Sequence, residues 1–311
     1  MKYLFTLYLL SIGILSYEQT IPTEIKSAKT SAHINMPRSK VFIVPPQGFT
    51  PSNDVSAIQN EDKAVIRVAE NPDGNFYIST ADFSRAAFEA KGIKILDYKE
   101  LTIDGYPAKM ILTQSPDGTN VYTLAFGDTT FFVAVMGAYS STDSKMGTDL
   151  QKAMQTIYYD KSFKVDPFAY TTFTLDDSQT RLKFFQYKSD MYIYYFNGQE
   201  KLPDSSNAFF MVTPLPAEGL MPAMMADIML GNTRKYGLTV LSADHVVTGK
   251  TNGFPSFQRE IYGTNQGKEV YIYQHVVVIG ETAVVMQGQA NKNFPVYLKD
   301  FQALSNTIRK K

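Results

Sequence analysis

The chain has 311 residues, of which 44% are hydrophobic, and its 30 basic side chains balance 30 acidic ones. A formal net charge of zero gives no electrostatic reason to expect nucleic acid as a partner, because such proteins concentrate basic residues on one surface. Cysteine is absent, which excludes disulfides, thiolate metal sites and lipid attachment through an N-terminal cysteine.

Residues 1–16 have the pattern of a secretory signal peptide. Lys2 supplies the positive end, and an apolar run over residues 3–15 follows it. About thirteen residues are too few to cross a hydrocarbon layer of roughly 30 Å, which takes about 20 in a helix. We therefore expect cleavage after Ser16, no stable membrane insertion afterwards, and export to the periplasm or the extracellular space.

Residues 17–37 are polar and lack sustained periodicity, so they are expected to form a flexible lead-in. A first domain is predicted over residues 38–160, beginning with a strand over 41–44 that Pro45 ends. Further strands are expected over residues 57–60 and 64–69.

A helix is predicted over residues 81–90, with Ser79 or Thr80 as its N-cap and Gly92 as its left-handed C-terminal residue. Its apolar residues recur at helical spacing: Phe83, Ala86, Ala87 and Ala90. The equivalent helix later in the chain is predicted over residues 222–235, with Pro222 at its first position and Gly237 after its end.

Each of these helices is followed by strands in which apolar residues either alternate with a period of two or form a continuous run. The short turns between the strands predict antiparallel pairing. The expected ranges are 93–103, 108–114, 121–126 and 130–136, then 238–247, 256–262, 270–278 and 282–287. Each series ends in an amphipathic helix. The apolar residues of these closing helices have the same spacing: Met146, Leu150, Ala153 and Ile157, against Tyr297, Phe301, Leu304 and Ile308.

The chain contains the same pattern twice, at an offset that drifts from 148 to 153 residues. The matching positions set turns and core: Gly105-Tyr106-Pro107 with Gly253-Phe254-Pro255, Val121-Tyr122 with Val270-Tyr271, Gly127-Asp128-Thr129 with Gly280-Glu281-Thr282, Gly137 with Gly288, and Leu150, Gln151, Thr156 and Ile157 with Phe301, Gln302, Thr307 and Ile308. We therefore predict an α+β protein of two tandem domains, residues 38–160 and 173–311, joined by a linker over 161–172. The second copy is expected to begin with a hairpin of strands 182–187 and 191–196.

The phrase from Val44 to Phe49, the strand from Ala64 that ends in Asn71-Pro72, the Gly-Tyr-Pro turn and the closing helix together resemble the PsbP-like superfamily. This resemblance implies an α-β-α sandwich around an antiparallel sheet in each domain. It also implies an accessory or docking role without catalysis, as in bacterial envelope proteins similar to DcrB. No functional residue of the superfamily can be carried over to this sequence.

The sequence contains three histidines, His33, His245 and His275, and none has the spacing of a shared metal site. In the repeat, His245 matches Glu100 and His275 matches Phe126, so the two copies share no histidine. The nucleophile elbow, the phosphate-binding loop and the dinucleotide fingerprint are also missing. We expect no catalytic residue, no metal and no cofactor.

Two clusters in the second copy are candidates for a ligand or partner surface. Four methionines lie on the helix predicted over 222–235 and just before it: Met221, Met224, Met225 and Met229. They could form a Cu(I) site or a pliable apolar groove, although core packing explains them more simply. Three aromatic residues alternate along one strand and share a face: Tyr192, Tyr194 and Phe196. They could stack on a ligand or lie packed beneath a helix.

The sequence thus predicts a non-enzymatic exported accessory protein that binds an envelope protein. The alternative is a small-ligand binding protein, for an apolar compound or a metal, that uses the cleft between the domains or the Met and Tyr surfaces of the second copy.

Overall fold

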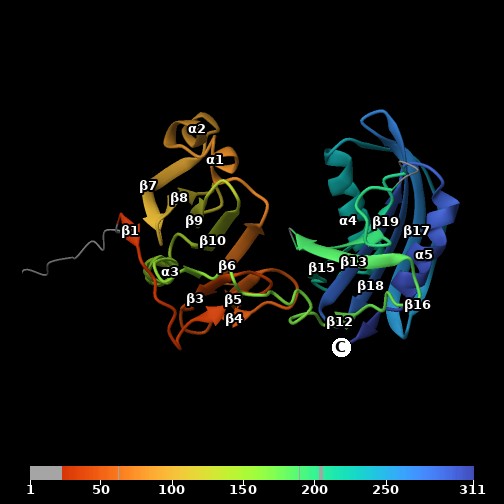
Figure 1. Cartoon of the computed structure of the whole chain (residues 1–311), viewed down its shortest axis with the longest axis horizontal. Helices are drawn as coiled ribbons and strands as arrows, with labels where there is room; N and C mark the ends of the chain where they lie inside the picture. Colours follow the sequence, from red (N-terminus) through yellow and green to blue (C-terminus); the bar gives the residue numbers. More distant parts are fainter. Residues whose placement is uncertain (1–22, 62, 189, 203–205) are drawn as a thin grey trace, which may run out of the picture.

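A computed structural model describes residues 23–311 except 62, 189 and 203–205, and it shows a mixed α+β protein built mostly of sheet. Figure 1 shows two sheets in two bodies that lie side by side along the long axis. We call residues 23–160 the first half and residues 173–311 the second half. The expected signal peptide, residues 1–16, lies outside the described residues.

The large sheet of the first half has eight strands. Their spatial order is β1 (Glu24–Ile25), β7 (Lys94–Ile103), β8 (Tyr106–Gln114), β9 (Thr119–Gly127), β10 (Phe132–Ser140), β6 (Ala64–Asn71), β5 (Ala57–Asn60) and β4 (Thr50–Pro51). All neighbours pair antiparallel except β1 and β7, which are parallel.

The large sheet of the second half has seven strands, all antiparallel. Their spatial order is β16 (Leu238–Thr251), β17 (Phe254–Asn265), β18 (Lys268–Ile279), β19 (Thr282–Ala290), β15 (Phe209–Pro216), β14 (Met191–Phe196) and β13 (Leu182–Lys188). The seven strands from β7 to β4 and the seven from β16 to β13 have the same order in space relative to their order in the sequence. This shared topology agrees with the internal repeat of the sequence.

Two small sheets close the halves. In the first half, β3 (Val41–Ile43) lies between β11 (Tyr158–Tyr159) and β2 (Ile34–Asn35). In the second half, β12 (Phe173–Thr174) pairs with β20 (Arg309–Lys310). Each small sheet therefore joins the start of its half to the residues just after the closing helix.

The closing helices are α3 (Ser144–Met154) and α5 (Phe294–Asn306), and both bury the apolar stripe that the sequence predicts. Leu150 and Phe301 are completely buried. Beneath each helix lies one of the matched glycines: a Cβ at Gly137 would lie 2.9 Å from Met154 Cε, and one at Gly288 would lie 2.3 Å from the ring of Phe301. The missing side chain lets each helix approach its sheet.

The second sheet carries a helix on each face (Figure 1), with α4 (Pro222–Lys235) opposite α5. Neighbouring residues of β18 separate accordingly, since Val277 packs in the cluster under α5 and Val276 in the cluster under α4. Pro222 is the first residue of α4, as predicted, and Gly237 follows its end with a φ of +102°.

The single helix predicted over residues 81–90 is wrong. Two short helices occur instead, α1 (Phe76–Ser79) and α2 (Arg85–Ala90). The Thr80 hydroxyl donates to the Phe76 carbonyl at 2.8 Å and ends α1, while Ser84 caps α2 by accepting from Ala87 N at 3.2 Å. The hydroxyl expected to begin the helix therefore closes the preceding one.

The sheet register also corrects the sequence alignment on one strand. Gly137 pairs with Tyr122, whereas Gly288 pairs with Tyr273, so Tyr122 corresponds to Tyr273 and not to Tyr271. By the same register His275 corresponds to Leu124 and not to Phe126, and the match of Gly127 with Gly280 is lost. A shift of two residues keeps every side chain on the same face, so the apolar pattern alone could not detect it.

The lead-in is the largest correction to the sequence prediction. Over residues 23–37 it is packed on the first half, where it supplies β1 and β2. Ile25 and Met36 are buried in the first core. The segment is short of apolar residues, but these two occupy core positions and its backbone pairs with two sheets.

No helix in the described residues is long and apolar enough to cross a membrane.

Candidate functional site

The aromatic row of the second half is part of the core. Tyr192, Tyr194 and Phe196 are all at most 2% exposed, so they do not form an accessible surface. Phe196 packs edge-on against Tyr297 and Phe301 of α5, which is the packing beneath a helix that the sequence left open as an alternative.

The methionine cluster is divided between core and solvent. Met225 is buried and Met229 packs partly against the same core, whereas Met221 and Met224 are 65% and 45% exposed. The four thioethers therefore do not converge on one site. Within the described residues, no cluster of three or more histidine, aspartate or glutamate side chains could hold a metal ion.

The histidines are also separate. His275 is fully buried, Thr251 Oγ1 lies 3.0 Å from its Nε2, and burial lowers the pKa of its imidazole to about 4. His33 Nε2 contacts the Thr156 carbonyl oxygen at 2.8 Å, and His245 lies at an irregularity of the edge strand β16. Each imidazole thus has its own surroundings.

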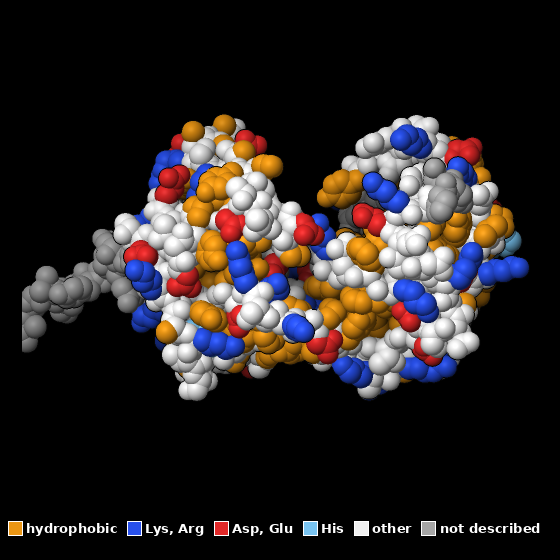
Figure 2. All heavy atoms as spheres, viewed as in Figure 1, with side chains coloured by type: hydrophobic (Ala, Val, Ile, Leu, Met, Phe, Trp, Pro, Cys, Tyr) orange, Lys and Arg blue, Asp and Glu red, His pale blue; other side chains and the backbone are white. Residues whose placement is uncertain are grey.

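A cavity lies between the two halves. We call it the seam pocket; its volume is about 490 Å³ and both halves line it. Figure 2 shows apolar side chains with charged ones among them along the waist where the halves meet. The lining residues are Arg38, Ser39, Lys40, Ser56, Arg67, Val68, Ala69, Glu70, Pro72 and Met136 of the first half, Phe184, Gln186, Tyr187, Lys188 and Asp190 of the second, and Val165 and Pro167 between them.

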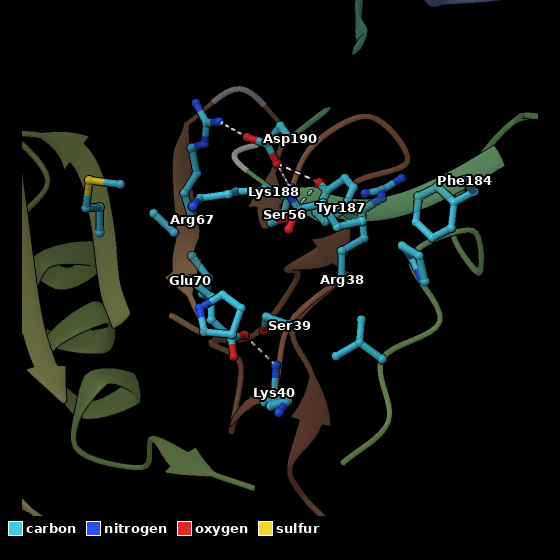
Figure 3. Close-up of a pocket in the computed structure, with 17 residues that line it drawn as sticks. Arg38, Ser39, Lys40, Ser56, Arg67, Glu70, Phe184, Tyr187, Lys188 and Asp190 are labelled. Atoms are coloured by element: carbon cyan, nitrogen blue, oxygen red, sulfur yellow. Dashed lines mark hydrogen bonds and ion pairs between the residues drawn. The ribbon is translucent and has the colours of Figure 1, made fainter. Parts of the chain in front are cut away.

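Asp190 joins the halves at one end of the pocket (Figure 3). Its carboxylate accepts hydrogen bonds from the Ser56 backbone N–H at 3.0 Å and the Tyr187 hydroxyl at 2.8 Å, and it forms an ion pair with Arg67 at 2.6 Å. Asp190 lies in the turn between β13 and β14, whereas Ser56 and Arg67 belong to the first half. A charge-assisted network of this kind fixes geometry better than an isolated surface pair.

Arg38 makes the second connection. It is 4% exposed, and its Nε donates to the Tyr192 hydroxyl at 2.8 Å while its Nη atoms donate to the carbonyls of Asn53 and Val55. Tyr192 in turn donates to the Pro167 carbonyl at 2.7 Å, and burial raises the pKa of its phenol to about 12. The ring of Tyr192 therefore packs in the core of the second half, while its hydroxyl forms hydrogen bonds at the contact between the halves.

A third connection lies outside the pocket. The Thr282 hydroxyl donates to Asp54 Oδ1 at 2.6 Å, and burial raises the pKa of the Asp54 carboxyl despite that hydrogen bond. Together these contacts hold the two halves against each other through residues that are far apart in the sequence.

The charges of the pocket are unequal, with four cations against two carboxylates. Glu70 accepts from the Lys40 backbone N–H at 2.9 Å and the Tyr159 hydroxyl at 2.8 Å, so both carboxylates already have partners in the protein. Lys188 forms no ion pair with another described residue. Figure 3 shows Lys188 near Arg67 and Asp190, at the end of the pocket opposite Lys40 and Glu70.

This arrangement is suited to holding a molecule. The walls are largely apolar, through Val68, Met136, Val165 and Phe184, and cations lie at both ends. Sequence reasoning named the cleft between the domains but not the residues of the pocket. Arg38 and Asp190 are 152 positions apart and no local motif connects them.

Neither known protein families nor curated proteins match the chain in sequence. Solved structures with a similar shape include the immunity protein TplEi of T6SS from Pseudomonas aeruginosa, with 12% identity, 90% of this chain and 97% of that chain covered, and a TM-score of 0.33. LpqN, involved in cell envelope biogenesis of Mycobacterium tuberculosis, has 17% identity over 44% of this chain and 82% of its own, with a TM-score of 0.31.

A cyanobacterial PsbP from Synechocystis also matches, with 6% identity, 49% of this chain and 100% of that chain covered, and a TM-score of 0.29. At TM-scores below 0.5 these likenesses carry no argument about function.

Proposed function

We propose that the protein is an exported, non-enzymatic binding protein of two tandem PsbP-like α-β-α sandwich domains, and that it binds an amphipathic anion in the seam pocket. The observation that carries this proposal is a cavity of about 490 Å³ whose lining combines apolar walls with cations from both halves. Small-molecule sites typically have volumes of about 300 to 1,000 Å³ and a few convergent polar groups.

The charges define the ligand class. Arg67 and Asp190 neutralise each other, which leaves the Lys188 ammonium as the cation at that end without an ion-pair partner among the described residues. A carboxylate or phosphate of the ligand would pair with Lys188, and an apolar chain would lie along Val68, Met136 and Phe184. Closing the ligand between two halves would exclude water from this ion pair and strengthen it.

A thermal-shift comparison tests this function with two probes of equal length, decanoate and decanol. Decanoate is expected to stabilise the full mature chain, by about 2.7 kcal/mol at 100 times its Kd, and decanol much less. Lys188→Gln should remove the preference for decanoate, whereas Lys292→Gln, a lysine outside the pocket, should retain it. A wider set of anionic amphipaths that gives no shift would reject the pocket as a ligand site.

A protein partner is the second candidate, favoured by exposed apolar side chains around α4. Met221, Met224, Ile228, Tyr236 and Leu241 are between 45% and 81% exposed. Exposed apolar groups close together mark interaction surfaces more often than isolated ones do. If this face binds an envelope protein, the partner should co-purify with the wild type and not with Ile228→Glu. Lys188→Gln, which is changed only in the seam pocket, should still retain the partner.

A further inference from the structure

The lead-in covers a continuous path over the first half. We call residues 23–36 the strap. It begins as β1, parallel to β7: Thr102 N donates to the Thr23 carbonyl at 3.0 Å and Asp104 N donates to the Ile25 carbonyl at 2.9 Å. The side chain of Ile25 is buried in the core beside this pairing.

The strap then crosses the C-terminal end of α3. Ser27 Oγ donates to the Gln155 carbonyl at 3.2 Å, and His33 contacts the Thr156 carbonyl. It ends as β2, which pairs antiparallel with β3 through Ile34 and Ile43. The strap therefore supplies a strand to the edge of the large sheet and a strand to the small one.

The same framework recurs in the second half. Thr156 and Thr307 follow the closing helices, and each accepts a bond at 2.9 Å through its Oγ1, from Val44 N and from Asp176 N respectively. The strand that precedes each donor, β3 or β12, pairs with the strand after the helix. Positions around the closing helices thus correspond in detail.

Among its described residues, the second half has no counterpart of either strand of the strap. Its large sheet ends at β16 and its small sheet has two strands, so among the described residues nothing pairs with the outer edges of β16 and β12. The linker cannot supply them, because thirteen residues join β11 to β12 whereas seventeen run from the start of β1 up to β3. The edge is left open by the way in which the two halves are joined.

A hollow lies where the second part of the strap would run. It has a volume of about 410 Å³, and four of its lining residues correspond to residues that the strap contacts on the first half: Thr174, Leu175, Asn306 and Thr307. The other lining residues are Asp176, Ala303 and Arg309. Thr174 and Leu175 correspond to Phe42 and Ile43, the residues with which β2 pairs. The open edge and the hollow together trace the path of the missing strap.

We propose that this path is a groove for an extended segment of another protein, which adds one strand parallel to β16 at Lys250–Thr251 and a second strand antiparallel to β12. Strand addition to an exposed edge draws its affinity from backbone hydrogen bonds and its specificity from side-chain pockets. The groove is separate from the seam pocket, and the proposal does not depend on a ligand there.

The charges of the groove indicate an acidic segment. On the first half, Lys29 Nζ of the strap lies 3.5 Å from the centre of the Phe42 ring. The second half has Thr174 in place of Phe42 and Arg309 in place of Tyr158. It therefore lacks the aromatic ring on which a lysine could lie at this position, and it has a positive charge beside it. Lys250 and Arg309 outnumber Asp176. A carboxylate in the segment is therefore favoured over the basic strap of a second copy.

Selection from a library of random peptides of the strap's length, displayed against the full mature chain, tests the groove. We expect enriched peptides to carry an apolar residue followed by aspartate or glutamate. Lys250→Pro should weaken their binding at least tenfold, because it removes the N–H that corresponds to Thr102 N, on an edge where proline leaves the ladder of β16 and β17 intact. Lys250→Ala, which removes the charge alone, should weaken it less.

Charge reversal supplies an independent measurement. Arg309→Glu should reverse the preference from acidic to basic peptides, and Lys292→Glu, away from the groove, should leave it unchanged, with unchanged circular dichroism for all variants. Enriched peptides that bind Lys250→Pro and Arg309→Glu as well as they bind the wild type would overturn the proposal. So would sedimentation of the wild type as a dimer that Lys250→Pro dissociates, because the occupant would then be a second copy. A failure here leaves the decanoate measurement unaffected.

Discussion

Corresponding residues of the two halves differ in polarity at the centre of their sheets. Leu124 in the first half is replaced by His275 in the second, and both are completely buried. The imidazole of His275 lies near the hydroxyls of Thr251 and Tyr273 and the amide of Gln258. One core thus contains a titratable group that the other lacks.

His275 should make the second half sensitive to acid. The unfolded chain binds a proton near pH 6.5, whereas burial lowers the pKa of the folded imidazole to about 4. The unfolded state therefore binds more protons between these values, and stability falls as the pH drops from 6.5 to 4, by about 3 kcal/mol from this group. His275→Gln should lose less stability over this window than the wild type, as measured by urea midpoints. Parallel curves for the two proteins would contradict this assignment.

Alanine at the two helix-facing glycines should give unequal losses. At Gly288 the new Cβ would overlap the rigid ring of Phe301, whereas at Gly137 it meets the flexible end of Met154. We expect Gly288→Ala to cost about 1 to 3 kcal/mol and Gly137→Ala clearly less. Urea unfolding of both variants measures the difference, and equal midpoints would show that α5 moves away from its sheet without cost.

At the scale of elements, the ends of α2 and α4 depend on left-handed glycines. Gly92 and Gly237 have φ values of +73° and +102°, a region that β-branched residues avoid. Valine at either position should cost about 1 to 2 kcal/mol. Gly231→Ala provides the control, because this glycine lies inside α4 with no atom within 4 Å of a new Cβ and alanine favours a helix. Chemical denaturation that shows no loss for either valine variant would contradict the role of these residues.

The sequence predicted best those elements whose signals are local. The closing helices, the four-strand series and the hairpin of β13 and β14 follow from periodicity and turn residues, and all are present. β15 was missed, because Pro214 and Pro216 mark its sequence as irregular, although it pairs with β19 over eight residues. The strands of the strap were missed because their own sequence carries no strand pattern. β1 forms only through pairing with β7, more than 70 residues further along the chain.

The candidate site could not be predicted at the same level. Tyr192 was identified as part of an aromatic face, but its contact with Arg38 joins residues 154 positions apart. Asp190 has no neighbour in sequence that marks it as the link to Ser56 and Arg67. Such residues become recognisable only when the two halves are placed against each other.

For the whole molecule, the contacts of Asp190 are expected to couple the two halves. Asp190→Ala leaves the buried Ser56 N–H without its acceptor, at a cost of about 1 to 3 kcal/mol, and it breaks the ion pair with the half-exposed Arg67. The Tyr187 hydroxyl loses its bond to Asp190 but keeps the Ser56 hydroxyl at 3.0 Å. Calorimetry should show one transition for the wild type and two for the variant. Asp300→Ala, which breaks an ion pair with Arg181 inside the second half, should lower stability without separating the transitions.

The strap also sets how many binding edges a chain of this design can have. An N-terminal arm that folds back onto its own domain can cover the sheet edges of that domain only, because the first residues of every further domain form the connection to the domain before it. The number of open edges therefore grows with the number of domains while the number of arms stays at one. Duplication alone, with no new residue at any site, is then enough to turn a domain whose sheet edges are covered by its own N-terminal arm into a protein with an unpaired edge strand.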